Sequence, residues 1–355
     1  MEQEQKIRVA ITHGDTNGVG YELIFKIFED PAMLELCTPV VYGSPKVATY
    51  HRKTLGMDVP FTVISSAEEA KDGRLNLLTT FSDDIKIDIG QPSDEATEAA
   101  RKALKQAMVD VQQKKADVLV MAPDNLPDFL SREPEVLRVR IADDLRIGLI
   151  TNLLAIKDVP EAITQQKVVD KVKILHTCLR RDLSISSPRI AVLALNPPTG
   201  NDSDPWGEEE KSVIIPAIEE LEHAGIQAFG PYAADRFFSE GSYIQFDAVM
   251  AMYYDQGMMP LKTIAQSDSI SLATGMPFVC TNAETGVSYH QAGKGCTDET
   301  ALRHAIFLAL DVFRNRQNYD EPLANPLPKL YKEKRDDSEK VRFAVPKPKE
   351  QQKKE

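Results

Sequence analysis

The segment Phe246-Asp-Ala-Val-Met-Ala-Met-Tyr-Tyr-Asp-Gln-Gly-Met-Met-Pro-Leu-Lys262 joins an apolar run directly to a polar one. The apolar run, Ala248 to Met252, has the length and composition of a buried strand. The polar cluster Tyr253 to Gly257 follows directly, and Lys262 is close enough in sequence to reach the same place. Open α/β sheets place ligand sites at the carboxyl ends of their strands. The segment therefore predicts a parallel sheet with a site at its edge.

The same alternation of apolar and amphipathic segments runs along the whole chain. Amphipathic, helix-like patterns such as 96–112, 165–180, 208–223 and 297–314 follow or separate the apolar runs. Strands that alternate with helices predict βαβ units, and therefore an α/β fold with a mostly parallel sheet. The Pro-rich, polar stretches near 123–135 and 197–206 are predicted to be loops. The other expected strands are Ile7 to Thr12, Pro39 to Tyr42, Val118 to Ala122, Leu145 to Thr151 and Ile190 to Leu195.

Composition narrows the class of protein. A chain of 355 residues with 42% hydrophobic content can form one large or two medium domains. A net charge of −12 argues against a general nucleic-acid binder, which needs a basic face. No apolar run reaches about 18 residues, so we expect no membrane span. The N-terminus is polar, which does not suit a secretory signal, and we expect a cytoplasmic location. The four cysteines are scattered and are expected to be reduced thiols. Residues 329–355 are charged and are predicted to be a disordered tail.

A glycine-rich segment, Ile11-Thr-His-Gly-Asp-Thr-Asn-Gly-Val-Gly-Tyr-Glu22, joins the first predicted strand to a helix. Glycines allow a tight turn and close backbone approach to a ligand, and a helix N-terminus favours anions. The spacing is not the Gly-x-Gly-x-x-Gly pattern of dinucleotide-binding proteins. His13 is either a site residue or a residue with a local hydrogen-bonding role.

Four segments resemble the 4-hydroxythreonine-4-phosphate dehydrogenase (PdxA) family. Met252 to Gly257 is similar to that family's Met-Tyr-His-Asp-Gln-Gly, and Gly14 to Gly20 looks like its opening Gly-Asp-Pro-x-Gly-Ile-Gly. Leu145 to Leu153 resembles Leu-Arg-Val-Ala-Leu-Val-Thr-x-His, and Leu195 to Gly200 resembles Leu-Asn-Pro-His-Ala-Gly. The resemblance extends from about Ile7 to Leu327, and the chain is identified as a member of this family.

The resemblance implies a fold like that of isocitrate and isopropylmalate dehydrogenases: two α/β domains with a cleft, forming a homodimer. We expect a PdxA-like region at 1–328, divided roughly into 1–125 plus 275–328 and 126–274. The family oxidises 4-phosphohydroxy-L-threonine with NAD and a divalent metal. NAD binding here is therefore possible, although the fold class carries no compact cofactor motif.

The family's three metal-binding histidines are all replaced in this chain. By resemblance they fall at Leu153 (or at Asn152 if the turn is one residue shorter), at Pro198 and at Tyr254. Leucine and proline side chains offer no donor atom, and an asparagine carbonyl is a poor ligand for zinc-like metals. The sequence therefore predicts no divalent metal at the position that the family uses.

The substrate contacts of the family also differ here. Its Gly-His-Thr-Glu segment is missing between 123 and 140, and its substrate asparagine and arginine fall at Ser271 and Cys280. A cysteine cannot replace a bidentate arginine contact with phosphate. Lys262, which matches a substrate lysine, and Asp255 remain as the catalytic candidates, with Lys262 also substrate-binding. His290 lies in a loop that the family uses near the substrate, and is a weaker candidate.

Two functions follow as hypotheses. The first is a degenerate PdxA paralogue without dehydrogenase activity, a pseudoenzyme that binds, scaffolds or regulates and pairs with itself or with an active relative. The second is an active NAD-dependent dehydrogenase, PdxA-like or acting without metal on another substrate through Lys262, Asp255 and Tyr254 or His290. We favour the first, because the metal ligands, the phosphate contact and the substrate loop all changed together.

Overall fold

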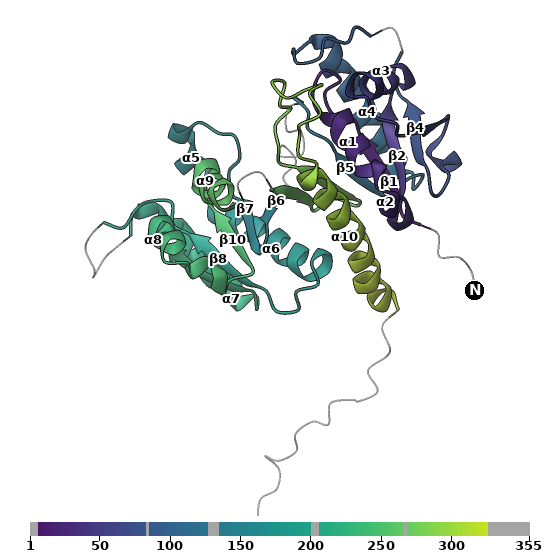
Figure 1. Cartoon of the computed structure of the whole chain (residues 1–355). Helices are drawn as coiled ribbons and strands as arrows, with labels where there is room; N and C mark the ends of the chain where they lie inside the picture. Colours follow the sequence, from purple (N-terminus) through teal and green to yellow (C-terminus); the bar gives the residue numbers. More distant parts are fainter. Residues whose placement is uncertain (1–5, 83–84, 127–134, 200–205, 266–267, 326–355) are drawn as a thin grey trace, which may run out of the picture.

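The computed structural model describes residues 6–82, 85–126, 135–199, 206–265 and 268–325 (Figure 1). Its strands form one twelve-stranded sheet in the order β3-β4-β2-β1-β5-β12-β11-β6-β7-β10-β8-β9. Most neighbouring pairs are parallel, which confirms the predicted α/β fold with a mostly parallel sheet. The predicted tail at 329–355 and most of the loop at 123–135 lie outside the described residues.

The first half of the sheet is entirely parallel. At its centre β1 (Arg8–Thr12) pairs with β2 on one side and with β5 on the other. Val9, Ala10 and Ile11 are fully buried, because helices cover both faces of this strand. The remaining strands of this half are β2 (Thr38–Gly43), β3 (Phe61–Ile64), β4 (Leu75–Thr79), β5 (Val118–Met121) and β12 (Val279–Ala283).

Antiparallel strands join the two halves. β11 (Ile270–Thr274) pairs antiparallel with β12 on one side and with β6 (Leu137–Ala142) on the other. β6 then forms an antiparallel pair with β7 (Leu145–Leu149). The second half continues in parallel through β10 (Ala248–Ala251), β8 (Arg189–Leu193) and β9 (Gln227–Tyr232).

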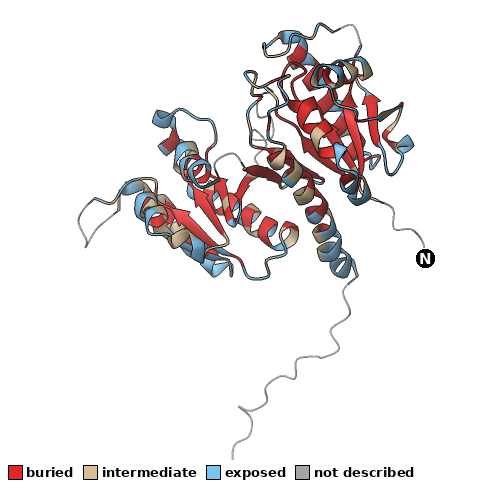
Figure 2. Ribbon diagram, viewed as in Figure 1, coloured by how far each residue is buried: buried red, intermediate tan, exposed pale blue. Residues whose placement is uncertain are grey.

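Helices cover both faces of the sheet. The largest core cluster lies on one face, where apolar residues of α1, α6, α7 and α10 meet the strands. The other face has two smaller clusters, one under α4 in the first half and one under α8 and α9 in the second. Figure 2 shows these strands as a buried layer between more exposed helices.

The helix bounds agree with most of the predicted helical segments. No described helix is both long and apolar enough to cross a membrane. The α-helices are α1 (Gly20–Glu29), α2 (Pro31–Leu36), α3 (Pro45–Leu55), α4 (Asp94–Gln112), α5 (Val159–Ala162), α6 (Gln165–Thr177), α7 (Ile215–His223), α8 (Ala234–Ser239), α9 (Tyr254–Ala265) and α10 (Thr300–Ala324). The predicted 165–180 and 208–223 helices contain π-helical turns at Cys178–Asp182 and Glu210–Ile214.

The helix α9 was not among the predicted helices. Its sequence contains Gly257 and an internal Pro260, which weaken a helical pattern. Tertiary packing explains it, because a Cβ on Gly257 would lie 2.7 Å from Leu149 Cδ2 and 2.9 Å from Ile147 Cγ2. The glycine lets α9 approach β7 closely. The division into two subdomains stays a prediction, because β11 pairs with a strand of each half.

Candidate functional site

Three adjacent parallel strands end at the same edge of the second half. β7, β10 and β8 are neighbours, and their carboxyl ends lead into Asn152 and Leu153, Tyr254 and Pro198 respectively. The sheet therefore brings together the three positions at which the resemblance expects metal ligands. The order and direction of the strands cause this convergence, so it does not depend on which side chains occupy the three positions.

The side chains at these positions do not suit a divalent metal. Leu153 is 76% exposed and Pro198 is half-buried, and neither has a donor atom. Tyr254 supplies a phenol and Asn152 an amide, neither of which is a preferred ligand of a zinc-like ion. Among the residues that the structure describes, no group of three histidine, cysteine or acidic side chains is placed to hold a metal ion.

Gln256 and Thr151 join the ends of these strands to one another. Gln256 Oε1 accepts a hydrogen bond from Met252 N at 2.7 Å, and its Nε2 donates to Ala194 O at 2.6 Å. Thr151 Oγ1 donates to Met252 O at 2.7 Å. Gln256 was expected as part of a polar site cluster, but its side chain is used to connect β10 with β8.

A second network fixes the turn after β8. Fully buried Glu210 accepts hydrogen bonds from Leu195 N and Asn196 N through Oε1, both at 2.8 Å. Asn196 Nδ2 donates to Glu209 Oε2 and to Glu210 Oε2, at 2.8 and 3.1 Å. A Cβ on Gly207 would lie 2.9 Å from Asn196 Nδ2 and from Glu210 Oε2, so a side chain there would shift two atoms of the network. The buried carboxylate is satisfied by the protein itself.

Asp255 and Lys262, the predicted catalytic residues, both lie on α9 and are exposed. Seven residues of helix correspond to two turns and about 10 Å of rise, so the two side chains share a face but not a contact. No ion pair joins them within the described part of the chain. Their catalytic role, and the substrate-binding role of Lys262, stay predictions. His290 is also exposed, in the loop after β12.

The glycine-rich segment forms a closely packed turn at the carboxyl end of β1. Gly14 has φ +70°, and a Cβ there would lie 2.1 Å from Pro123 O. A Cβ on Gly20 would lie 1.9 Å from His13 O. Glycine is therefore required at both positions by close contact between backbones. The turn leads into α1, as expected from the sequence.

Polar side chains tie this turn to three other loops of the first half. Tyr289 OH donates to Asp15 Oδ2 at 2.8 Å, and Asn125 Nδ2 contacts the same hydroxyl. Asn17 accepts a hydrogen bond from Asp88 N and donates to Gln91 O, both at 2.9 Å. Burial and the Asp15 carboxylate raise the pKa of Tyr289. Tyr289 and Asn125 were not predicted from the sequence, because their partners are distant in the chain.

His13 packs as an aromatic side chain. It is fully buried and stacks on Tyr21, with ring centroids 5.1 Å apart, and Tyr21 stacks on His51. Its two ring nitrogens are buried, and the choice between a site role and a local hydrogen-bonding role for His13 stays a prediction. Burial, followed by the nearby His51, lowers the pKa of His13 from 6.5 to about 3. The ring is therefore neutral near pH 7 and packs against Tyr21 and Phe81.

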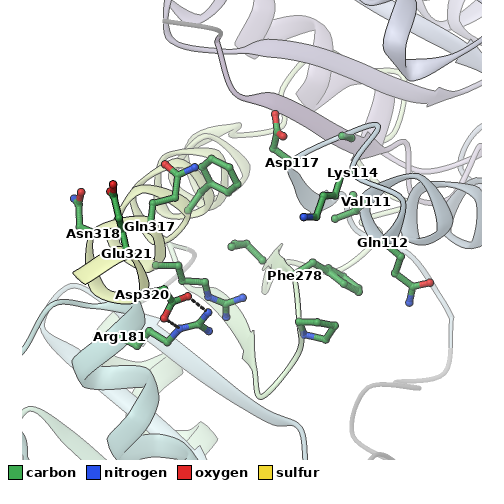
Figure 3. A pocket seen from close by; sticks show the side chains of 15 residues that line it. Val111, Gln112, Lys114, Asp117, Arg181, Phe278, Gln317, Asn318, Asp320 and Glu321 are labelled. Carbon is green, nitrogen blue, oxygen red and sulfur yellow. Dashed lines mark hydrogen bonds and ion pairs between the residues drawn. The ribbon is translucent and has the colours of Figure 1, made fainter. Parts of the chain in front are cut away.

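A cavity of about 990 Å³ lies at the opposite edge of the first half (Figure 3). It is bordered by residues that precede β5 and β12, such as Asp117 and Phe278, and by the end of α10. Arg181 Nε donates to Asp320 Oδ1 at 2.8 Å across it. Because this edge holds the amino ends of β5 and β12, the cavity is separate from the carboxyl-edge site.

Together these features define an open α/β protein whose candidate site lies at the carboxyl edge of its sheet. A family model described as "Pyridoxal phosphate biosynthetic protein PdxA" matches residues 35–309. The chain belongs to the PdxA family, as its sequence resemblance predicted. The fold and the family are thus established together.

Relatives with known names support this assignment. The chain is 43% identical over 358 residues to the 4-hydroxythreonine-4-phosphate dehydrogenase of Bacteroides thetaiotaomicron, covering 96% of this chain and 98% of the relative. It is 28% identical to the D-threonate 4-phosphate dehydrogenase of Cupriavidus necator, covering 84% and 95%. These relatives are named as oxidoreductases of phosphorylated hydroxy acids.

Solved structures agree with the fold. A 4-hydroxythreonine-4-phosphate dehydrogenase from Burkholderia phymatum matches with a TM-score of 0.70 and 28% identity, over 87% of this chain and 99% of that one. The enzyme of the same name from Klebsiella pneumoniae matches in fold with a TM-score of 0.74 and 23% identity, over 88% and 99%.

Proposed function

We propose that this PdxA-family protein binds a small ligand in the family's cleft without metal-dependent dehydrogenation. The observation that carries this proposal is the donor set at the ends of β7, β10 and β8. The backbone brings the three positions together, but Leu153, Pro198 and Tyr254 replace the expected ligands. Lewis-acid assistance of alcohol oxidation requires the metal to be held by such donors.

The surrounding polar groups support the same proposal. Gln256, Asn196 and Glu210 direct their side chains to backbone groups and to one another. These bonds keep the shape of the strand ends and do not supply a substitute ligand set. Because the residues of a site and not its fold determine function, a kept scaffold does not imply a kept reaction.

A second candidate is an active NAD-dependent dehydrogenase, and the comparisons on their own favour it. Relatives up to 43% identical over nearly the whole chain are named 4-hydroxythreonine-4-phosphate dehydrogenases. This candidate is either PdxA-like or acts without metal on another substrate. In the metal-free form Lys262, Asp255 and Tyr254 or His290 would handle the proton, and NAD, when bound, would supply the hydride acceptor. Exposed positions on α9 make Asp255 and Lys262 accessible to a substrate.

NADH formation separates the two candidates. Purified protein is mixed with 4-phosphohydroxy-L-threonine and NAD, with zinc, with magnesium or with EDTA, beside the Bacteroides relative as a positive control. Absence of turnover with an active control supports the binding role. EDTA-resistant turnover that Lys262→Met abolishes supports the second candidate, whereas turnover that requires a metal overturns the account of the donor set.

The assembly and location belong to the proposal as well. Leu153, Ile156 and Met259 are large apolar side chains that are 76%, 71% and 66% exposed, and all three follow strands that end at the carboxyl edge. We propose that this carboxyl-edge surface contributes to a homodimer, or to pairing with an active relative, in the cytoplasm. Light scattering after size exclusion should give a dimer mass, and Ile156→Glu should give a monomer. A monomeric wild-type chain at micromolar concentration would rule out the homodimer.

A further inference from the structure

The cavity at the amino edge of the first half lies where three parts of the chain meet (Figure 3). Its volume of about 990 Å³ is in the range of small-molecule sites. One wall is the corner between α4 and β5, and the opposite wall is formed by the last turns of α10. Arg181, from the π-helical turn that follows α6, borders the same space. The cavity is therefore large enough for a ligand that contacts all three parts.

Apolar side chains line part of the cavity. Phe278 directly precedes β12, and Figure 3 shows its ring between the α4 side and the α10 side. Val111 of α4 is buried, and Phe313 of α10 is half-buried. Aromatic side chains give a large apolar contact area and pair well with other flat rings, offset-stacked or edge-to-face. This part of the lining favours a ligand with a flat, apolar body.

Two arginines line the cavity with N–H groups to spare. Buried Arg316 donates through Nε and Nη2 to the Asp182 carboxylate, at 2.8 and 2.9 Å, and through Nη1 to Met276 O at 3.3 Å. Arg181 donates through Nε and Nη2 to the Asp320 carboxylate, which is thereby neutralised. A guanidinium has five N–H donors, so two of Arg316 and three of Arg181 find no acceptor among the described residues.

The remaining charged groups of the lining favour an anion as well. Lys114 is exposed at the corner before β5, and its ammonium has no ion-pair partner in the part of the chain that the structure describes. Asp117 Oδ2 already accepts a hydrogen bond from Arg8 N at 2.7 Å. Glu321 is exposed near the end of α10, where water and salt screen its charge. The unused hydrogen-bonding capacity thus consists mainly of cationic donors.

We propose that this cavity is a binding site for an organic anion with a flat aromatic body, such as an aryl carboxylate. The ring packs on Phe278 and Phe313, and the carboxylate accepts hydrogen bonds from the cationic side chains of the walls. Hydrogen bonds between charged partners are about twice as strong as neutral ones, so the anionic group contributes much of the affinity. The cavity is separate from the ends of β7, β10 and β8, so this inference goes beyond the function proposed for that edge.

Isothermal titration calorimetry of the full chain tests this site with three probes. 1-Naphthoate is the aromatic anion, 1-naphthamide is its neutral counterpart, and acetate is an anion without a ring. The test variant is Lys114→Gln with Arg181→Gln. The matched control is Lys105→Gln with Arg180→Gln, which removes the same charges from exposed positions that do not line the cavity. Thermal melting checks that both variants fold.

We expect 1-naphthoate to bind the wild-type chain with a dissociation constant below about 1 mM. 1-Naphthamide and acetate should each bind at least about 10-fold more weakly, and the test variant should weaken 1-naphthoate about 10-fold, with the control variant unchanged. If the test variant fails to fold, Lys114→Gln alone decides, with a loss of about 3-fold because this lysine is exposed. No binding of 1-naphthoate, equal binding of 1-naphthamide, or equal affinity in wild type and test variant overturns the site.

Discussion

The Tyr289 hydroxyl donates a hydrogen bond to the Asp15 carboxylate over 2.8 Å, although 274 residues separate the two in sequence. Asp15 is buried, so its carboxylate depends on this partner and on the backbone N–H of Asn17. We predict that Tyr289→Phe lowers the free energy of unfolding by about 1–2 kcal/mol, because it removes the donor from a buried charge. Urea denaturation measures this. Tyr50→Phe, at an exposed position on α3, should change nothing, and an equal loss in both variants would contradict the prediction.

The buried His13 ring should make stability depend on pH. Its pKa is about 3 in the folded chain against 6.5 for the free side chain, so the unfolded chain binds the proton more readily. The contribution of the neutral His13 ring to the free energy of unfolding is therefore fully present above about pH 6.5 and is lost as the pH falls toward 3. From pH 7.5 to 5 we predict a loss of about 2 kcal/mol from this residue.

The His13 prediction is checked by urea denaturation of the wild type and of His13→Phe at both pH values. Phenylalanine keeps the stacking on Tyr21 but does not titrate. His51 is also buried with a lowered pKa, and it is present in both chains, so the difference isolates His13. Identical pH slopes in the two chains would show that His13 is not buried in its neutral form.

Restoring histidines should create a metal site. The variant Leu153→His, Pro198→His, Tyr254→His puts imidazoles at the ends of three adjacent strands. We predict that zinc at 100 times its dissociation constant stabilises this variant by about 2.7 kcal/mol and leaves the wild type unchanged. Melting with zinc and with EDTA measures the effect. A second variant with Asn152→His in place of Leu153→His shows which of these two residues corresponds to the family's metal ligand. No stabilisation by zinc in either variant would show that the three positions do not converge.

Gln256 and Asp255 are neighbours in sequence, but substituting them should change the free energy of unfolding by different amounts. Gln256→Leu leaves Met252 N and Ala194 O without their partner, and should cost about 1–3 kcal/mol in the free energy of unfolding. Asp255→Asn changes an exposed side chain and should stay within about 0.5 kcal/mol of the wild type. Denaturant titration of both variants provides the comparison. A destabilising Asp255→Asn would indicate a structural rather than a site role.

The sequence predicted the parallel strands well because burial on both faces demands continuous apolar runs. Val9 to Ile11 and Ala248 to Met252 are examples, and both are buried strand residues or their immediate continuation. The family resemblance gave the correct order of segments. It also gave Asn152 or Leu153, Pro198 and Tyr254 as the positions of the family's metal ligands, and these residues follow three adjacent strands of the sheet.

The parts that could not be predicted depend on contacts between distant residues. The helix α9 forms despite Pro260 because Gly257 packs against β7, and that contact is invisible in a local pattern. Tyr289 and Asp15 meet only after the whole first half has folded. Arg138 and Arg140 look like the solvent-facing side of a half-exposed strand, whereas the register buries them beside Glu284.

The antiparallel ladders in the middle of the sheet limit how the molecule can move. A hinge usually consists of a few loop residues whose dihedral angles absorb a rotation. Here the halves are joined through the paired backbones of β12, β11 and β6, so swinging one half away from the other would break rows of interstrand hydrogen bonds. A small change in the twist of the shared sheet is the deformation that keeps these hydrogen bonds. Such a change would keep the ladders of β12, β11 and β6 paired while it reorients one half relative to the other.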